Sequence, residues 1–422
     1  MSNNGNINLN NTSANLNFEK ICSIIQEGTP KNLVENKRVL VLTPDSTRTA
    51  PLPVMIKAIK STVGSYTAKL DFMIALGTHP IMSKKAIYEL FGISEKEKQN
   101  EFADNKFLNH RWDLPETLVK IGSFEKNEIE TLTNGLFSER IDVTINREIF
   151  AYDLLIILGP IFPHEIVGFS GGHKYLFPGI SGGEFLDFFH WLSAVIGCSN
   201  TIGRKETPAR SVVEKAAEMV SVPRHLIAMV VTSASGLENL YAGEPKETWA
   251  KAVAHSSKIH IVKKERPYKT VLGCAPHMYD EMWVAGKVMY KLEPIVADGG
   301  TLIIYGPHIN KISQTWGNYI KEIGYHVAEY FLVDIDSYQH IPRGVLAHSA
   351  VVKGAGTFNK NIEKPRINVV LATGLSKQTC EEINLGYMNP LKLDVNSFKN
   401  RETEGILCVE HAGEVLHLLN DK

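Results

Sequence analysis

Short apolar runs, separated by longer segments with helical spacing, make up the chain from about residue 18 onward. In the first half, apolar runs at 38–43, 72–76, 154–158 and 226–231 predict buried strands. Strands that alternate with helices indicate a parallel sheet with helices on its faces. The intervening spacing predicts helices at 18–25, up to about 61, at 82–91, from about 181 to 190, and at 207–220 and 247–256, with a further strand at 258–264.

The same alternation starts again at residue 269. We therefore expect an α/β fold made of two α/β domains with largely parallel sheets, at 18–268 and 269–422, and an active-site cleft between them. Residues 1–17 contain eight asparagines and predict a disordered tail. In the second half we predict strands at 269–274, 301–305, 326–332, 367–371 and 406–410, and helices at 279–291, 311–323, 377–385 and 413–419.

Composition narrows the class of protein. Hydrophobic residues make up 44% and charged residues 22%, and the net charge is −1, which is typical of a soluble globular protein and predicts no binding to nucleic acid or to a membrane. Five scattered cysteines without a CxxC pair suit a reducing cytoplasm. No apolar run is long enough to span a bilayer, and the N-terminus has no signal-peptide pattern. The oligomeric state stays open.

The most unusual stretch of the chain is 159–190, which follows the apolar run at 154–158. It carries three titratable residues, His164, Lys174 and His190. Taken singly, Lys174 is typical of a solvated lysine, and His190 beside aromatic residues is typical of a core histidine. Together, among many glycines and few other charges, they indicate a functional site. The glycines allow close approach of another group and stand at 168, 171, 172, 179, 182 and 183.

Two other strand ends carry polar residues. The segment 45–51 follows the first strand and holds Asp45 and Arg48, while His79 follows the strand at 72–76. In parallel sheets, ligands bind at the carboxyl ends of the strands, where the planar fork of Arg48 suits a carboxylate. The alternative is that Asp45 or Ser46 caps a helix, that Arg48 lies in solvent and that His79 is a cap.

The spacing around Lys174 resembles the nickel-dependent lactate racemase family. His164 stands ten residues before Lys174, and His190 stands sixteen residues after it. In that family the lysine carries a covalent nickel-pincer nucleotide, the later histidine ligates the nickel and the earlier histidine is an acid/base. The resemblance therefore implies a nickel-pincer nucleotide on Lys174, a nickel ligand at His190 and a catalytic His164.

The resemblance extends to other segments. The DxTRxxP arrangement at 45–51 is similar to a family motif whose arginine grips the substrate carboxylate, and His79 matches a second catalytic histidine. Lys287 stands eleven residues after Pro276, as does a family lysine that contacts the same carboxylate, although an exposed helix lysine is the alternative. The residues implied to bind the cofactor with Lys174 are Asp45, Gly171 and Gly172.

The departures from the family lie on the substrate side. Met278 stands where the family has an acid, Val284 where it has a glutamine, and the pocket tryptophan has no secure equivalent, His348 being nearest. We therefore expect a larger, polar 2-hydroxy acid such as gluconate rather than lactate; an aliphatic or aromatic hydroxy acid is the alternative. The residues expected to receive hydroxyls are His277, Tyr279, Asp280 and His348. The roles of His110, read as a surface residue, and of His173 stay open.

Two other classes of protein are compatible with the same residues. Lys174 could form a Schiff base with pyridoxal phosphate, or the protein could carry nickel or a nucleotide without catalysis, which gives His79 no use. In the racemase interpretation, the partners are a small 2-hydroxy acid and the enzymes that synthesise the cofactor.

Overall fold

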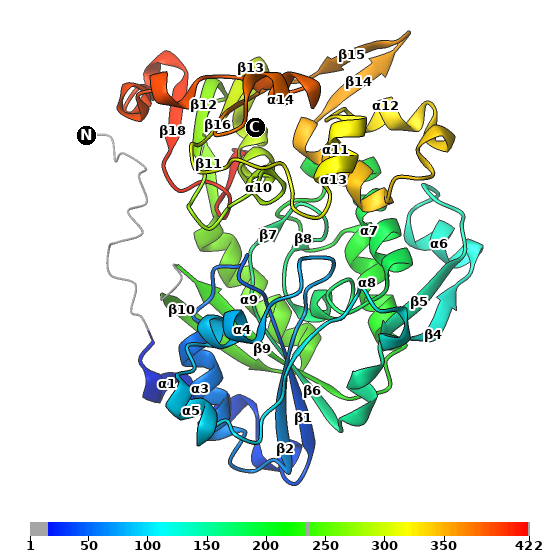
Figure 1. Cartoon of the computed structure of the whole chain (residues 1–422), viewed down its shortest axis with the longest axis vertical. Helices are drawn as coiled ribbons and strands as arrows, with labels where there is room; N and C mark the ends of the chain where they lie inside the picture. Colours follow the sequence, from blue (N-terminus) through cyan, green and yellow to red (C-terminus); the bar gives the residue numbers. More distant parts are fainter. Residues whose placement is uncertain (1–15, 233–235, 421–422) are drawn as a thin grey trace.

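The computed structural model describes residues 16–232 and 236–420 and contains two main sheets (Figure 1). The six-stranded sheet has the order β10-β9-β6-β1-β2-β3, and β10 alone runs antiparallel to its neighbour. Its strands are β1 (Arg38–Thr43), β2 (Lys69–Ile74), β3 (Phe107–Asn109), β6 (Leu154–Pro160), β9 (Arg224–Val231) and β10 (Leu237–Gly243).

Helices cover both faces of this sheet, which explains why the central residues of β1, 39–42, are all apolar. Val39 and Val41 pack on one side with α1, α3 and α4, whereas Leu40 and Leu42 pack on the other with α7, α8 and α9. The helices are α1 (Phe18–Gly28), α3 (Leu52–Thr62), α4 (Lys84–Phe91), α7 (Gly183–Ile196), α8 (Pro208–Glu218) and α9 (Pro245–His260).

The five-stranded sheet has the order β17-β16-β13-β12-β18 and is parallel throughout. Helices α10 (Met282–Leu292) and α13 (Arg343–Lys353) pack with Val271 and Leu302 on one face. The arrangement confirms the predicted α/β class with largely parallel sheets. The strands are β12 (Tyr268–Cys274), β13 (Val296–Gly306), β16 (Asn368–Thr373), β17 (Gly386–Tyr387) and β18 (Ile406–Val409).

Two-stranded pairs and short helices lie outside the two main sheets and complete the fold. The pairs are β4 (Leu118–Phe124) with β5 (Ile141–Asn146), β7 (Pro163–His164) with β8 (Gly168–Phe169), β11 (Ile261–Lys264) with β19 (Leu416–Leu419) and β14 (Gly356–Asn359) with β15 (Ile362–Pro365). The helices are α2 (Lys31–Val34), α5 (Glu95–Gln99), α6 (Lys126–Leu132), α11 (Gly317–Ile323), α12 (Ala328–Leu332) and α14 (Lys377–Glu382).

Two predicted elements are wrong. The predicted strand at 326–332 is largely the helix α12, and the predicted helix at 413–419 ends instead in β19. β19 forms because its backbone pairs in parallel with β11, which stands far earlier in the chain. Tertiary pairing of this kind overrides local preference.

The structure describes the last two residues of the predicted tail and does not test the predicted domain boundary. Residues 1–15 of the tail lie outside the described residues; Leu16 donates its N–H to the carbonyl of Leu237, and Asn17 caps α1. The boundary at 268/269 stays a prediction. Within residues 16–232 and 236–420, no helix combines the length and the apolar character needed to cross a bilayer.

Candidate functional site

A cavity of about 330 Å³ is lined by residues of both predicted domains. Loops after the carboxyl ends of β1, β2 and β6 line one side, and residues of α10 and α13 line the other, as expected for α/β sheets. Among the residues predicted for catalysis, carboxylate binding, cofactor binding and nickel ligation, Gly172 is the one that does not line the cavity. Those that line it are Asp45, Arg48, His79, His164, Gly171, Lys174, His190 and Lys287.

Asp45 and His79 form a pair at the ends of β1 and β2. The Asp45 carboxylate contacts Nδ1 of His79 and also accepts the N–H of Thr47 at 3.1 Å and its hydroxyl at 2.7 Å. Burial alone would raise the pKa of Asp45, but His79, Thr47 and Arg48 hold it well below its usual range. Because Nδ1 is occupied, Nε2 is the nitrogen of His79 that can meet a ligand. Asp45 contact with a cofactor stays a prediction.

His164 has a different environment. Its Nδ1 accepts the backbone N–H of Ile166 at 3.1 Å and lies 3.3 Å from a carboxylate oxygen of Glu165. Its Nε2 is buried and has no hydrogen-bond partner within the described residues. Burial first, and then the positive charges of Lys174 and Arg48, hold the pKa of His164 well below its usual value. The imidazole is therefore neutral at pH 7 and has one nitrogen left for a bound molecule.

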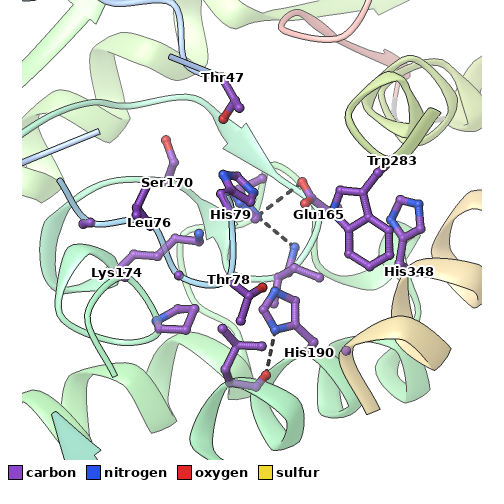
Figure 2. Close-up of a pocket in the computed structure, with 18 of the residues that line it drawn as sticks. Thr47, Leu76, Thr78, His79, Glu165, Ser170, Lys174, His190, Trp283 and His348 are labelled. Atoms are coloured by element: carbon purple, nitrogen blue, oxygen red, sulfur yellow. Dashed lines mark hydrogen bonds and ion pairs between the residues drawn. The ribbon is translucent and has the colours of Figure 1, made fainter. Parts of the chain in front are cut away.

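Lys174 and His190 present two nitrogens to the same cavity (Figure 2). Burial, followed by the charge of Arg48, lowers the pKa of Lys174 to about 7, so a large share of its amine is uncharged near neutrality. Nδ1 of His190 donates to the carbonyl oxygen of Leu186 at 2.6 Å, and burial lowers the pKa of His190 to about 4. Its Nε2 therefore carries a lone pair, as a metal-ligating histidine requires.

Arg48 and Lys287 place two cations at one end of the cavity. Nζ of Lys287 donates to the backbone carbonyl of Thr47 at 2.9 Å, next to Arg48 in the chain, and lies 4.9 Å from the ring centre of Tyr279. Burial, followed by the charge of Arg48, lowers the pKa of Lys287 to about 7. An anion bound between these two groups would relieve their repulsion, so the pair suits a carboxylate.

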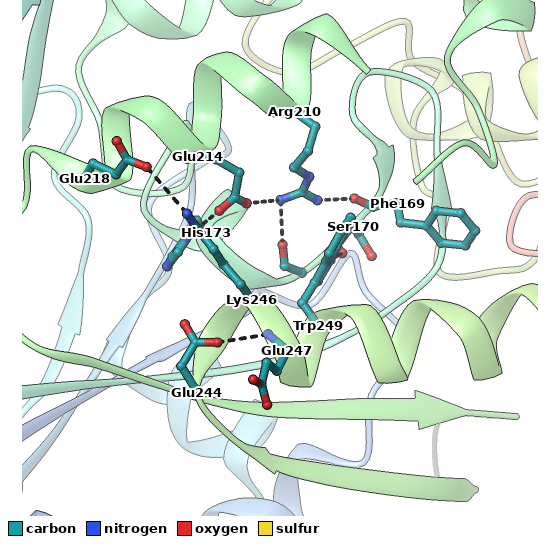
Figure 3. A network of polar contacts seen from close by, with 11 residues as sticks. Phe169, Ser170, His173, Arg210, Glu214, Glu218, Glu244, Lys246, Glu247 and Trp249 are labelled. Atoms are coloured by element: carbon teal, nitrogen blue, oxygen red, sulfur yellow. Dashed lines mark hydrogen bonds and ion pairs between the residues drawn. The ribbon is translucent and has the colours of Figure 1, made fainter. Parts of the chain in front are cut away.

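A polar network on the far side of the glycine-rich loop holds it in place (Figure 3). The guanidinium of Arg210 is buried, donates to the carbonyls of Phe169 and Gly171 and lies 4.2 Å from the ring centre of Trp249. The Trp249 indole donates to the carbonyl of Ser170 at 2.9 Å. Three successive loop carbonyls before Lys174 are therefore fixed by side chains from α8 and α9.

The amino-acid sequence resembles that of known proteins. The Lactate racemase N-terminal domain family matches residues 7–201. The lactate racemase of Thermoanaerobacterium thermosaccharolyticum is 26% identical over 281 residues, which cover 65% of this chain and 61% of that protein. In sequence the chain therefore resembles the lactate racemase family over its first half. The sequence match thus spans about three fifths of the curated relative's length.

Solved structures extend the likeness to nearly the whole chain. A crystal structure of a Thermotoga maritima protein superposes with a TM-score of 0.87 at 31% identity and covers 96% of this chain and 99% of its own. The lactate racemase apoprotein of T. thermosaccharolyticum superposes with a TM-score of 0.70 at 19% identity, covering 94% of this chain and 92% of that one. At this identity, the second match shows that the two proteins share a fold.

Of the remaining histidines, one lies where the sequence did not place it. His110 is buried, not on the surface: its Nε2 lies 3.1 Å from the carbonyl oxygen of Ser181, and its Nδ1 lies 3.1 Å from the amide nitrogen of Asn146. His173 turns to Glu214, with 2.7 Å between Nδ1 and the carboxylate, and belongs to the loop-supporting network. His348 lines the cavity, as proposed.

Sequence reasoning missed the aromatic wall and two acids of the site. Trp112, Trp283 and Trp316 line the cavity together with Glu165 and Asp187. Trp112 also donates its indole N–H to the backbone carbonyl of His79 at 2.9 Å. No local pattern marks these residues, because helices and loops from separate parts of the chain bring them together; only the position of Trp283, one turn before Lys287 on a helix, could have drawn attention.

Proposed function

We propose that the protein is an isomerase that inverts C2 of a 2-hydroxy acid by reversible hydride transfer to a nickel-pincer nucleotide held on Lys174. One observation carries the proposal: the amine of Lys174 and Nε2 of His190 line one cavity with the histidines His79 and His164 and with the cationic pair Arg48 and Lys287. A racemase needs a proton-transfer group for each face of the substrate, and His79 and His164 come from different strand ends.

The residues present fit the cofactor that the family implies. Lys174 would hold the nucleotide through its amine, and His190 would ligate the nickel. Within residues 16–232 and 236–420, no group of three or more His, Cys, Asp or Glu side chains is arranged to hold a metal ion, so the other donors would come from the cofactor itself. When bound, this cofactor supplies the acceptor for the C2 hydride and returns it.

The side chains of this protein position the substrate and move its proton. Arg48 and Lys287 bind the carboxylate and fix C2 within the cavity. His79 takes the proton of the C2 hydroxyl at Nε2, where its lone pair lies because Nδ1 donates to the Asp45 carboxylate. His164 is neutral and accepts the N–H of Ile166 at Nδ1, so it carries its hydrogen on Nε2 and donates it in a hydrogen bond to the substrate. For the opposite configuration the two histidines exchange these roles, which requires His164 to carry its hydrogen on Nδ1 instead.

The substrate is proposed to be larger than lactate. The sequence favoured a polar acid such as gluconate, with lactate or another aliphatic or aromatic hydroxy acid as the alternative. Of the four residues expected to receive hydroxyls, His348 lines the main cavity, whereas Tyr279 lines a smaller neighbouring one and His277 and Asp280 line neither. The three tryptophans in the wall instead favour the alternative of a non-polar side chain.

The decisive experiment is intact-protein mass spectrometry with nickel analysis, on protein produced alongside the cofactor-synthesis enzymes. We expect a nucleotide-sized adduct on Lys174 and about one nickel per chain, with both lost in Lys174→Ala. The adduct should persist without borohydride, which a Schiff base needs for trapping. An active protein whose Lys174 is unmodified would refute the proposal, and an adduct without any racemisation would favour a non-catalytic carrier.

A further inference from the structure

Three tryptophans and one histidine form a continuous aromatic wall in the cavity. The rings of Trp283 and His348 stack with centres 3.8 Å apart and planes inclined by 20°, side by side in Figure 2. The ring of Trp316 lies 6.3 Å from Trp283 and 6.3 Å from Trp112, which belongs to the other predicted domain. This aromatic wall, Trp112–Trp316–Trp283–His348, lines the cavity throughout.

The position of the wall relative to the carboxylate clamp identifies the part of the substrate that meets it. Trp283 and Lys287 stand four residues apart on α10, so their side chains emerge on one face, separated by one helical turn of about 5.4 Å. Both residues line the cavity, with Val284 between them. A substrate whose carboxylate lies on Lys287 therefore places the carbons beyond C2 beside Trp283 and Val284.

Several polar groups near this wall already have partners. Nε2 of His348 lies 3.5 Å from the hydroxyl of Tyr325, the carboxylate of Asp187 accepts the N–H of Gly344 at 3.0 Å, and the carboxylate of Glu165 lies 3.3 Å from Nδ1 of His164. Apart from Lys287 and Tyr290, the other side chains of α10 and α13 that line the cavity are apolar: Val284, Val345, Ala347 and Val351. A sugar acid, with a hydroxyl on every carbon beyond the carboxylate, would place hydroxyls without partners against these apolar side chains, which is unfavourable.

We infer that the aromatic wall binds an aromatic ring, so that the substrate is a 3-aryl-2-hydroxy acid, of which 3-phenyllactate is the simplest. The inference rests on the proposed function and names the substrate class of the same site. A phenyl ring on C3 has no hydroxyl to satisfy and can pack face to edge or offset against Trp283 and Trp316. Lactate would leave the wall without a partner.

Racemisation by the nickel-loaded protein tests the inference with 3-phenyllactate, lactate and gluconate. Apolar pockets discriminate by about 10–200-fold per methylene, so we expect kcat/KM for phenyllactate to exceed that for lactate by on the order of 10²-fold. Trp283→Ala should lower kcat/KM for phenyllactate on the order of tenfold more than for lactate, whereas Trp283→Phe retains a ring and should keep most of the preference. Saturation-transfer NMR of the loaded protein should show contact between the protein and the phenyl protons.

The outcomes separate the two proposals. If lactate or gluconate has the highest kcat/KM, or if Trp283→Ala lowers phenyllactate and lactate turnover equally, the aryl substrate is refuted while the racemase stands. If no 2-hydroxy acid is racemised by protein that carries the adduct on Lys174, the proposed function itself fails. The adduct mass and the thermal midpoint of each variant, measured beside the parent protein, report any loss of folding or of cofactor. If Trp283→Ala loses its folding or its cofactor, Val284→Gln is tested in its place. Val284→Gln should raise gluconate turnover relative to phenyllactate turnover only if the wall contacts the carbons beyond C2.

Discussion

The Asp45 carboxylate contacts Nδ1 of His79, whereas Nδ1 of His164 accepts the backbone N–H of Ile166. The two histidines also differ in exposure, with 33% of the His79 side chain exposed and 4% of that of His164. Nδ1 of His79 donates to a carboxylate, so its lone pair is on Nε2, whereas Nδ1 of His164 accepts an N–H, so its hydrogen is on Nε2. The two histidines therefore present unlike nitrogens to the cavity.

Loss of either histidine should stop turnover without loss of the cofactor. General acid–base groups typically contribute ~10²–10⁴-fold, so His79→Ala and His164→Ala should each lower kcat by that factor. Neither is the proposed nickel ligand, so nickel content should equal that of the parent protein. Racemisation rates together with metal analysis check this, and near-normal turnover in His79→Ala would show that the second proton-transfer group lies elsewhere.

Asp45→Asn tests the orientation of His79. An amide can donate a hydrogen to Nδ1, which would place the ring hydrogen on Nε2 and remove the lone pair that accepts the substrate proton. We expect kcat to fall by on the order of 10²-fold or more, with KM changed little because the clamp is intact. Thr47→Val is the matched control: it removes a donor to the same carboxylate but keeps its charge, and it should have a smaller effect on kcat.

The amine of Lys174 should react as an uncharged group at neutral pH. Its pKa of about 7 lies below the ordinary 10.5, so in the cofactor-free protein acylation should be half-maximal near pH 7. Lys85, whose side chain is 86% exposed, is the internal control. Because the unfolded chain binds this proton more tightly, Lys174 should destabilise the fold below about pH 10.5, with the full penalty reached below pH 7. Peptide mass spectrometry across pH measures both lysines; equal profiles would contradict the prediction.

The local sequence pattern was enough to predict the strands that helices cover on both faces. The run at 38–43 reads as a strand because helices cover both sides of β1, and no polar alternation interrupts it. The predicted helix at 413–419 was wrong because β19 depends on β11, a partner that lies some 150 residues earlier, as the pairing of Ile261 with Leu416 shows. Pairing over that separation leaves no local signal.

The residues of the candidate site also differ in whether the sequence alone could identify them. Residues carried by a motif with fixed spacing, such as Lys174 and His190, could be named from sequence, and the fold brings them to one cavity. Trp112 and Trp316 could not, because they stand on segments without a motif and approach each other only when the two sheets pack. The family's pocket tryptophan had no secure equivalent in the sequence, whereas the tryptophans that line the cavity come from three separate places in the chain.

Arg210→Met should both destabilise the fold and impair cofactor attachment. The substitution removes the side chain that donates to two loop carbonyls and leaves the half-buried carboxylate of Glu214 with His173 as its remaining ionic partner. Breaking a buried ion pair typically costs about 3–5 kcal/mol, so we expect a loss near the lower figure because His173 remains. Loosened carbonyls before Lys174 should also lower the fraction of chains that carry the adduct.

Lys215→Met on the same helix separates this effect from a general loss of charge on α8. Lys215 is 51% exposed and pairs with Glu218 at the surface, so its loss should change the free energy of unfolding by less than about 1 kcal/mol and leave the adduct intact. Arg210→Lys keeps the charge but not the planar fork that reaches both Phe169 and Gly171, and it should fall between the two. Urea unfolding and intact mass measure these effects. If Arg210→Met is as stable and as fully loaded as Lys215→Met, the network does not position the loop, and the presentation of Lys174 must rest on the glycine backbone alone.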